Sequence, residues 1–550
     1  MNKNHLSILP ILLTFSFCFP LVCFSQIAPA IQWQNTIGGS NYDNLYSIQQ
    51  TTDMGYILGG FSLSNISGDK TENNWDTTCN PTCTYDYWIL KTDSSGNIQW
   101  QNNIGGNDHD VLYSILQTVD DGYTLGGYSE SNVSGDKTEN NMGPLYTSDY
   151  WIVNTDSAGN IQWQNTIGGN SWDVLRSIQQ TIDGGYILGG YSWSGISGDK
   201  TENSIGNYDY WIVKTDSTGN IQWQNTIGGS DADFLYSIQQ TADGGYILGG
   251  YSNSGISGDK TENTNGGTDY WIVKTDSLGN IQWENTIGGA ENDELISIKQ
   301  STDGGYILGG SSDSDISGDK TENNWDTTLI TSDFWIVKTD GIGNILWQNT
   351  IGGNHSDKLF SILQSTDGGY VLGGRSTSNI SGDKTENSNG AGDYWVVKTD
   401  SLGNIQWQNT IGGNFNDELY SMKQTTDGGY ILGGWSASNI SGDKTENSNG
   451  GQDYWIVKLA TDAITSITQL PNYQLPICIS PNPFADKLNC ATNTNEFSEF
   501  ILYDIASREL LRQTFTNTAS LNTEQLAKGI YIYEVRNKDG LCKKGKVVKD

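Results

Sequence analysis

A stretch of eleven residues, Gly-Asn-Ile-Gln-Trp-Gln-Asn-Thr-Ile-Gly-Gly, occurs seven times along this 550-residue chain with small changes. Its tryptophans are Trp33, Trp100, Trp163, Trp223, Trp283, Trp347 and Trp407. Between copies comes the same order of segments, typified by residues 235–241, 245–252 and 269–276. A fixed period of about 60 residues indicates a repeat architecture in which each unit cannot bury its apolar face alone.

Each unit contains four short β-type runs. The tryptophan run alternates apolar and polar residues, as a half-exposed strand does, whereas residues 245–250 and 269–274 are apolar on both faces, as strands between stacked sheets are. Turn signals such as Asp243-Gly244 separate the runs. Four strands per unit without helical periodicity predict an all-β fold, with the units as blades of a β-propeller.

The two ends of the repeat array predict that the propeller is closed. The array opens on a lone tryptophan run, Ile31–Ile37, and stops after Lys458 without a final one. An open stack would leave both ends as exposed strand edges, which invite aggregation. We therefore predict a seven-bladed β-propeller over residues 27–460, in which the N-terminal strand completes the last blade.

Two known repeats share features with this unit. The run Asp-Ser-x-Gly-Asn-Ile-Gln-Trp resembles the tryptophan-docking repeat of pyrroloquinoline-quinone propellers, with a spacing that differs by one residue. The Gly-Gly that ends the second strand resembles kelch repeats. Both resemblances imply propeller geometry and nothing more, and the spacing of the sialidase Asp-box is absent.

The N-terminal segment and the charge constrain where the chain acts. Residues 1–26 read as a signal peptide, with Lys3 before a mostly apolar stretch and a cleavage site near Gln26. A lipoprotein modified at Cys23 is the weaker alternative, because valine precedes it where a small residue is usual. No later stretch reaches the ~18 apolar residues of a membrane helix, so we expect no transmembrane segment after cleavage. The formal charge of -34 argues against a nucleic-acid partner.

Beyond Lys458 the repeat stops, and we expect a linker over residues 461–476 and a separate domain over residues 477–550. Its motif residues are Pro481, Asn482, Pro483, Gly529, Tyr531, Lys546 and Lys549. With them, this tail resembles the type A C-terminal sorting domain of the type IX secretion system of Bacteroidota (the Por secretion tail family). The resemblance implies a small β-sandwich, the type IX machinery as partner, export through the periplasm, and a secreted or outer-membrane surface location. Ala506 stands where that family usually has glycine, and an ordinary C-terminal adhesion domain is the alternative.

The seven copies differ from one another mainly in the loops of one face, which join the second and third strands and lead from one blade into the next. Of the 19 tryptophans, fourteen belong to the repeat itself. The other five fall in these variable parts and are candidate ligand-binding residues: Trp75, Trp172, Trp193, Trp325 and Trp435. Aromatic platforms suit sugars and peptides, and loops on a rigid scaffold often carry binding. The alternative is neutral drift, with each tryptophan packed on its own blade.

Two acidic features could bind a cation. An aspartate opens the first strand of every blade and predicts a ring near the channel mouth: Asp43, Asp110, Asp173, Asp233, Asp293, Asp357 and Asp417. We favour a structural role for these residues, in which each carboxylate accepts local backbone N–H bonds. The recurring Ser-Gly-Asp-Lys-Thr-Glu-Asn resembles a calcium loop only loosely, because its lysine places a positive charge in the site.

Nothing in the sequence nominates catalysis, a metal or a cofactor. The mature chain keeps only His109 and His355, and it has no metalloprotease motif, phosphate loop or nucleophile elbow. A local disulfide between Cys79 and Cys83 is favoured over metal binding, since no histidine or second cysteine pair lies nearby. The leading interpretation is a non-enzymatic, monomeric propeller that binds a glycan or a protein. The alternatives are a propeller enzyme (quinoprotein-like or polysaccharide-degrading) and a passive surface coat protein.

Overall fold

The computed structural model describes residues 28–76, 84–326 and 331–462, and in the tail 478–480, 486–491, 498–504, 508–516, 518–537 and 540–549. The chain divides into two compact units, Met1–Ile464 and Thr465–Asp550. Every regular element in the described residues is a strand, so the all-β prediction is confirmed. The predicted signal peptide, Cys79, Cys83, Pro481, Asn482 and Pro483 lie outside the described residues.

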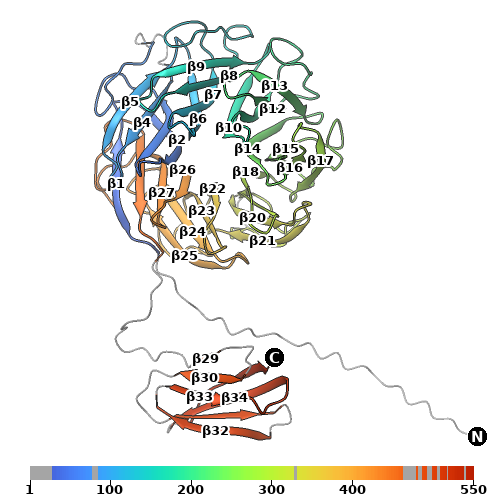
Figure 1. Cartoon of the computed structure of the whole chain (residues 1–550). Coiled ribbons are helices and arrows are strands. Elements are labelled where there is room, and N and C mark those ends of the chain that lie inside the picture. The colour runs from blue at the N-terminus through green and yellow to red at the C-terminus, as the bar shows by residue number, and fades with distance from the viewer. Residues whose placement is uncertain are drawn as a thin grey trace, which may run out of the picture. The chain divides into compact units, whose positions relative to one another are not determined.

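The first unit consists of four-stranded antiparallel sheets that lie around one axis, and seven are present in its described part (Figure 1). Sheets 1 to 6 take four consecutive strands each, from β2-β3-β4-β5 to β22-β23-β24-β25. Sheet 7 has the order β26-β27-β28-β1, so its last strand comes from the start of the chain. This is a propeller-like arrangement of repeated sheets.

The first strand of each sheet faces the axis, and each contacts the first strands of both neighbours. These innermost strands are β2 (Asp43–Gln50), β6 (Asp110–Gln117), β10 (Asp173–Gln180), β14 (Asp233–Gln240), β18 (Asp293–Gln300), β22 (Asp357–Gln364) and β26 (Asp417–Gln424). A β-bulge after the third residue, at Leu45 in β2, recurs in all of them. The bulge turns the fourth residue of the strand towards the axis.

The second and third strands form the middle of each sheet and are almost wholly buried. The second strands are β3 (Tyr56–Ser62), β7 (Tyr123–Ser129), β11 (Tyr186–Ser192), β15 (Tyr246–Ser252), β19 (Tyr306–Ser312), β23 (Tyr370–Ser376) and β27 (Tyr430–Ser436). The third strands are β4 (Asp86–Thr92), β8 (Asp149–Thr155), β12 (Asp209–Thr215), β16 (Asp269–Thr275), β20 (Asp333–Thr339), β24 (Asp393–Thr399) and β28 (Asp453–Leu459). The Gly-Gly of the second strand permits close packing, because a Cβ on Gly59 would lie 2.6 Å from Leu112 Cδ2 of the next sheet.

The fourth, outermost strand of each sheet contacts the next sheet. These strands are β5 (Ile98–Ile104), β9 (Ile161–Ile167), β13 (Ile221–Ile227), β17 (Ile281–Ile287), β21 (Ile345–Ile351), β25 (Ile405–Ile411) and, from the N-terminus, β1 (Ile31–Ile37). Trp33 of β1 packs against Gly96 in sheet 1. Gly96 has a φ of 86°, a conformation that is strained for a residue with a side chain. Asn35 Nδ2 donates to the carbonyl oxygen of the same glycine at 2.8 Å. These contacts explain why the tryptophan run is kept with little change in every copy of the repeat.

Contacts between sheet 7 and sheet 1 repeat those between the other neighbours. β1 pairs with β28 from Ile31 to Ile37. The Ile48 amide donates to Ser421 Oγ at 3.3 Å, and the Tyr454 hydroxyl donates to the Trp88 carbonyl at 2.9 Å. Asp462, just past the repeat, accepts from Trp407 Nε1 at 3.2 Å at the place where the other sheets have a turn. The two ends of the array are therefore joined by strand pairing and by side-chain contacts.

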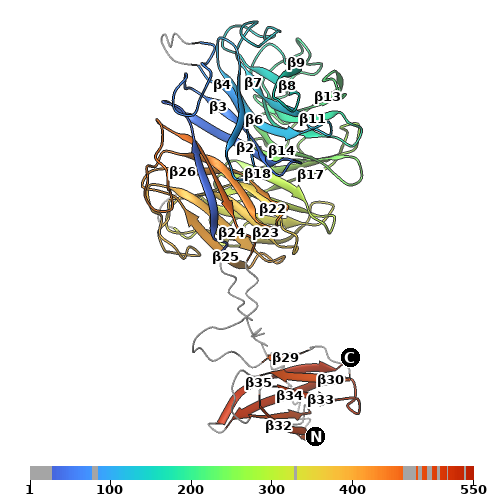
Figure 2. The same cartoon turned by 60° about the vertical axis from the view of Figure 1, so that its left-hand side comes forward.

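The C-terminal unit contains two antiparallel sheets that share one core (Figure 2). One sheet is β29 (Cys478–Ser480), β30 (Lys487–Ala491) and β33 (Thr518–Asn522). The other runs β32 (Glu509–Phe515), β31 (Ser498–Tyr503), β34 (Gly529–Asn537) and β35 (Gly540–Lys549). Leu488 and Leu521 of the first sheet pack with Phe500, Leu502 and Val535 of the second. This is the arrangement of a small β-sandwich.

Candidate binding site

Trp75 and Trp325 occupy equivalent loop positions in sheets 1 and 5 and are half exposed, at 52% and 51%. The Trp75 Nε1 donates to Asp136 Oδ2 of sheet 2 at 2.8 Å, and its ring lies over Gly135. Trp325 makes the same contacts with sheet 6, through Asp383 and Gly382. In the other five sheets, the corresponding place is held by Met142, Ile205, Asn265, Asn389 and Asn449. Both tryptophans thus join neighbouring sheets.

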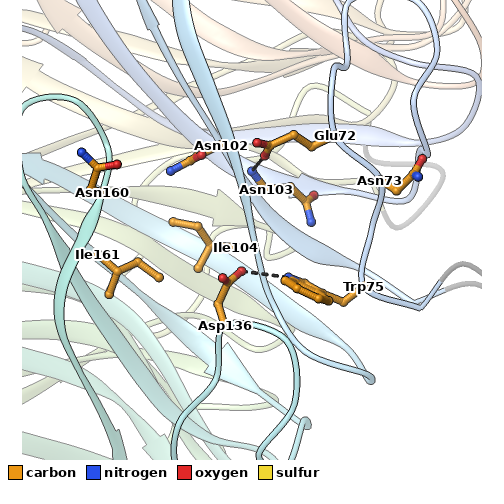
Figure 3. Close-up of a pocket in the computed structure, with 9 residues that line it drawn as sticks. All are labelled: Glu72, Asn73, Trp75, Asn102, Asn103, Ile104, Asp136, Asn160 and Ile161. Atoms are coloured by element: carbon orange, nitrogen blue, oxygen red, sulfur yellow. Dashed lines mark hydrogen bonds between the residues drawn. The ribbon is translucent and has the colours of Figure 1, made fainter.

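Figure 3 shows the pocket beside Trp75, of about 400 Å³, between the outer parts of sheets 1 and 2. Its polar groups are largely engaged within the protein: Glu72 accepts from the Asn103 amide at 2.7 Å, and Asn102 Nδ2 donates to the Gly159 carbonyl at 2.6 Å. Asp136 already holds the Trp75 indole. The pocket is therefore lined by the contacts that hold two sheets together.

The other three tryptophans lie in two separate sheets. Trp172 and Trp193 are neighbours in sheet 3, where the Trp193 amide donates to the Trp172 carbonyl at 2.8 Å. Trp193 is 47% exposed, and its ring contacts Tyr208 at 5.5 Å. Trp435 lies inside β27 and is 5% exposed. The structure brings Trp172 and Trp193 together and leaves the other predicted tryptophans on separate sheets.

The seven aspartates that open the innermost strands are fully buried. Asp43 Oδ2 accepts from the Gly39 amide at 2.6 Å and from Ser64 Oγ at 3.0 Å, and the other six carboxylates make the same pair of contacts. Burial raises the pKa of Asp233 to about 6. These carboxylates anchor the loop that enters each sheet, and within the described residues no group of three or more His, Cys, Asp or Glu side chains is placed to hold a metal ion.

The Ser-Gly-Asp-Lys-Thr-Glu-Asn segment also holds the fold. Ser67 and Lys70 bridge across the turn, and the Lys70 Nζ, which is buried, lies 5.3 Å from the centre of the Trp88 ring. Glu72 accepts a hydrogen bond from the Asn103 amide of the outer strand β5. Cation–π contact with the tryptophan and these hydrogen bonds give the lysine and the glutamate structural partners.

Residues that differ between the sheets meet at the axis. The fourth positions of the innermost strands carry Tyr46, Tyr113, Arg176, Tyr236, Ile296, Phe360 and Tyr420. Tyr46 contacts Tyr113 and Tyr420 with ring centres 5.0 and 4.7 Å apart, and Phe360 contacts Tyr420 at 4.8 Å. We call these seven side chains the axial collar. Because one collar residue comes from each sheet, unlike side chains are placed next to one another although the sheets are alike.

Arg176 is the cation of the collar and lies among tyrosines. Its guanidinium carbon is 4.1 Å from the ring centre of Tyr113 and 4.8 Å from that of Tyr236, and Nη2 donates to the Tyr191 hydroxyl at 3.1 Å. No carboxylate in the described residues forms an ion pair with it. The neighbouring tyrosines raise the pKa of Arg176, against the effect of burial, which is the largest single influence and lowers it. The guanidinium is held in place by aromatic rings while its charge has no anionic partner.

A second layer of side chains lies above the collar, towards the variable loops. In each sheet it consists of one cross-strand pair, in which the second residue of the first strand lies opposite the sixth residue of the second strand. From sheet 1 to sheet 7 the pairs are Asn44 with Phe61, Val111 with Tyr128, Val174 with Tyr191, Phe234 with Tyr251, Glu294 with Ser311, Lys358 with Arg375 and Glu418 with Trp435. Sheets 1 to 4 present apolar and aromatic side chains together with Asn44, and the charges of this layer come from sheets 5 to 7. We call this layer, with the collar, the axial patch.

Loop residues extend the aromatic half of the patch. In sheet 1, Phe61 contacts Tyr85 at 4.6 Å, and Tyr85 contacts His109 at 4.7 Å. Around sheet 3, Tyr208 lies between Trp193 at 5.5 Å and Phe234 at 5.3 Å. Trp193 therefore forms the exposed edge of an aromatic cluster that continues inward to Arg176.

The charged half is tied together by hydrogen bonds. Arg375 Nη1 pairs with Glu418 Oε1 at 2.7 Å, and Nη2 donates to Asn416 Oδ1 at 3.0 Å. Tyr420 of the collar donates to Glu418 Oε2 at 2.7 Å. Burial and the Glu418 carboxylate raise the pKa of Tyr420, so its hydroxyl stays protonated at neutral pH. Lys358 is exposed at the edge of this half.

The axial patch was not predicted, although the sequence holds a signal for it. The first strands differ mainly at their second, fourth and seventh positions, apart from Met422 at the sixth position of β26, and the second strands differ most at their sixth. Those strand positions are the ones that meet at the axis. A comparison restricted to the loops selects Trp75 and Trp325 and overlooks Arg176.

The described residues contain no helix that is both long and apolar enough to cross a membrane. Residues 479–550 match the family model of the secretion system C-terminal sorting domain. The regulatory protein FlaEY of Caulobacter vibrioides is 24% identical to this chain over 332 residues, which are 54% of this chain and 34% of that protein. This chain thus spans about a third of that relative.

Several solved structures are similar at a distance. Sqt1 from Chaetomium thermophilum has a TM-score of 0.39 at 10% identity, over 78% of this chain and 100% of its own. A fungal alcohol oxidase in complex with copper has a TM-score of 0.40 at 10% identity, over 95% and 99%. YCF48 bound to D1 peptide has a TM-score of 0.36 at 9% identity, over 79% and 98%. Similarities this distant carry no inference about function.

Proposed function

Because the C-terminal unit of this chain is a type IX secretion sorting domain, we propose that the chain is an exported, non-enzymatic, seven-bladed β-propeller that binds a glycan or a protein through its axial patch. The signal peptide and the sorting domain take it through the periplasm to the cell surface or the medium. The N-terminal strand β1 closes the ring, so the propeller is complete without the sorting domain.

One observation supports binding at the axis more than any other. In a chain whose sheets are nearly identical, side chains that differ between sheets gather at this end of the axis, and they are mostly apolar or aromatic in sheets 1 to 4 and mostly charged in sheets 5 to 7. Purely structural contacts repeat from sheet to sheet, as the buried aspartates and the tryptophan run do. A surface that departs from the repeat is what a single asymmetric ligand requires.

The chemistry of the patch suits a ligand with both a flat apolar face and an acidic or polar group. Trp193 and Tyr208 offer ring faces for stacking. Arg176 offers a guanidinium held by tyrosines and without an ion-pair partner in the described residues. Such a cation can pair with a carboxylate at little cost in side-chain entropy, because it is already ordered.

Binding is tested by presenting the full chain to glycan arrays and, separately, to cell-surface protein extracts followed by affinity measurement of each hit. Trp193→Ala and Lys358→Ala together remove the exposed edges of both halves of the patch. The double variant loses an aromatic contact worth about 0.5–1.5 kcal/mol and one positive charge. Together these losses should weaken binding about tenfold. Ile182→Ala is the matched control, since Ile182 is 95% exposed in a hairpin turn at the other end of the innermost strands.

Three outcomes distinguish a glycan ligand, a protein ligand and a passive coat protein. A hit on the glycan array that the double variant loses identifies a glycan ligand, and a protein hit with the same behaviour identifies a protein ligand. If no ligand is found in either screen, or if the Ile182→Ala chain weakens binding as much as the double variant does, the axial patch is not the binding site and a passive coat protein is the better account.

A further inference from the structure

The other end of the innermost strands carries a second set of unlike residues. The seventh positions of these strands are Gln49, Leu116, Gln179, Gln239, Lys299, Leu363 and Lys423. They are in one register, because Gln49 opposes Ile57, Lys299 opposes Ile307 and Lys423 opposes Ile431. The seven side chains therefore lie at the same level of the ring, next to the hairpin turns.

The three glutamines show that this level faces the axis. Gln49 Oε1 accepts from the Gln117 amide at 3.1 Å, Gln179 Oε1 from the Gln240 amide at 2.7 Å, and Gln239 Oε1 from the Gln300 amide at 2.9 Å. Each of these amides belongs to the innermost strand of the next sheet, whose inner edge has no strand partner. The glutamine side chains thus run along the inner edge of the ring.

These contacts use the acceptors and leave the donors. The carbonyl oxygen of each glutamine side chain is occupied by an amide, whereas Nε2 of Gln49, Gln179 and Gln239 has no acceptor among the residues that the structure describes. An amide NH₂ group can donate two hydrogen bonds. At this level of the axis, three glutamine side chains therefore have free hydrogen-bond donors.

Two lysines add positive charge to the same level. Lys299 is half-buried and Lys423 is exposed, and within the described parts of the chain neither ammonium makes a hydrogen bond or an ion pair. Desolvation by the surrounding protein, and then the charge of Lys423, lowers the pKa of Lys299 to about 8, and desolvation also lowers the pKa of Lys423. Among the described residues, no carboxylate is close enough to raise the pKa of either lysine.

The absence of an acid is notable in a chain with 63 aspartates and glutamates. In six of the seven sheets, the aspartate of the turn between the first two strands already pairs with a lysine of the third strand, as Asp303 does with Lys338 and Asp427 with Lys458, both at 3.0 Å. The same pairing occurs in sheets 1, 3, 4 and 6. In sheet 2, Asp120 and Asp121 of this turn accept from Thr118 and Thr52 instead. Intramolecular neutralisation of Lys299 and Lys423 by these carboxylates is therefore not available.

We propose that Lys299 and Lys423, with the free amide donors of Gln49, Gln179 and Gln239, form a binding site for a tetrahedral oxyanion, a phosphate or a sulfate, at the axis on the hairpin side. An oxyanion accepts several hydrogen bonds at once and relieves the repulsion of two like charges. The site lies at the opposite end of the innermost strands from the axial patch, so it does not depend on the proposed function.

The site is tested by titrating the full chain at pH 7 and low ionic strength with inorganic phosphate and with sulfate, with chloride as the reference anion. Isothermal titration calorimetry gives the affinity. The variants are Lys299→Gln and Lys423→Gln, alone and together, because glutamine is the natural residue at this position in sheets 1, 3 and 4. Lys358→Gln, on the patch side, is the matched control for the loss of one positive charge.

Phosphate or sulfate should bind the natural chain with a dissociation constant below about 1 mM, the double variant should lose at least tenfold, and Lys358→Gln should bind as the natural chain does. Glucose 6-phosphate and a sulfated monosaccharide, titrated in parallel, distinguish a free ion from an ester: tighter binding of the ester indicates a site for a phosphorylated or sulfated sugar. An independent readout is the melting temperature, which phosphate should raise in the natural chain and leave unchanged in the double variant. Absence of binding to both anions, or equal binding by the double variant, would overturn the proposal.

Discussion

At the scale of single residues, most of the unusual chemistry in this chain is structural. Each third strand begins with a buried aspartate and carries a tyrosine next to it, except that sheet 5 has Phe334 in the tyrosine position. The Tyr454 hydroxyl donates to the Trp88 carbonyl of the next sheet at 2.9 Å. One side chain thus makes a buried hydrogen bond across a boundary between sheets.

Tyr454→Phe should therefore destabilise the propeller. The loss of a buried hydrogen bond that leaves the Trp88 carbonyl without this donor costs about 1–2 kcal/mol. The measurement is the free energy of unfolding in urea. Phe334→Tyr is the reciprocal variant and should stabilise the chain or leave it unchanged, because the hydroxyl it adds faces the Trp395 carbonyl as the other tyrosines face theirs. Equal stability of Tyr454→Phe and the natural chain would contradict this role.

The buried aspartates predict how stability depends on pH. Burial raises the pKa of Asp333 to about 8 and that of Asp209 and Asp269 to about 7. These groups bind protons in the folded state over a range where the unfolded chain has lost them, so the free energy of unfolding falls as pH rises from 5 to 8. Lysines such as Lys200, with a pKa lowered to about 8, remain charged below that pH and contribute little slope.

The melting temperature should accordingly be higher at pH 5.5 than at pH 8. Asp333→Asn, which removes one titrating group and keeps its shape, should flatten the pH dependence relative to the natural chain. The measurement is calorimetric melting at constant ionic strength. A melting temperature that rises between pH 5.5 and 8 would show that these carboxyls are ionised in the folded state.

At the scale of elements, the strands and their order could be predicted from the sequence because the repeat presents each strand seven times. The Gly-Gly pairs, the turn signals and the alternation in Ile31–Ile37 all agreed with one four-stranded unit. The axial patch could not be obtained in the same way. Its residues are defined by the bulge after Leu45 and by the contact of Tyr46 with both neighbouring sheets, and neither follows from the spacing of one unit.

The tryptophans illustrate the same limit. Their position in variable parts of the repeat makes five tryptophans candidates for ligand binding, yet Trp435 is in a strand, and Trp75 and Trp325 each donate an indole hydrogen bond to the next sheet. Loop variation alone does not distinguish a side chain that crosses to a neighbour from one that faces solvent. Arg176 differs from the residues at the same strand position in the other six sheets. A difference inside a strand is a stronger signal than a difference in a loop.

The N-terminal strand gives the prediction that belongs to this scale. Deleting residues 27–38 removes β1, exposes the edge of β28 and takes Trp33 away from Gly96. Loss of buried side chains of this size costs about 2–5 kcal/mol each, and the free edge invites association. We expect aggregation or a clearly lower melting temperature. A shortened chain that stays monomeric and melts as the natural chain does would show that β1 is not needed to close the ring.

At the scale of the whole molecule, the array of repeated sheets and the sorting domain are separate compact units. A chain ending after Asp462 should fold on its own, since Asp462 still accepts from Trp407 Nε1 and Lys398 Nζ. In a host with the type IX system it should remain in the periplasm, which fractionation and surface labelling measure. A chain ending at Leu459, which lacks Asp462, should melt lower. Surface display of the chain that ends after Asp462 would refute the sorting role of the tail.

The most direct test of the account is site-specific photo-crosslinking of the exported protein on living cells. A photoreactive amino acid is placed at Trp193, on the exposed edge of the axial patch, and in a separate chain at Ile182, in a hairpin turn at the other end of the innermost strands. The account predicts a discrete adduct from position 193 that position 182 does not give, and loss of that adduct when Arg176→Ala is added. Adducts of equal yield from both positions, or none from position 193, would contradict ligand binding at the axial patch.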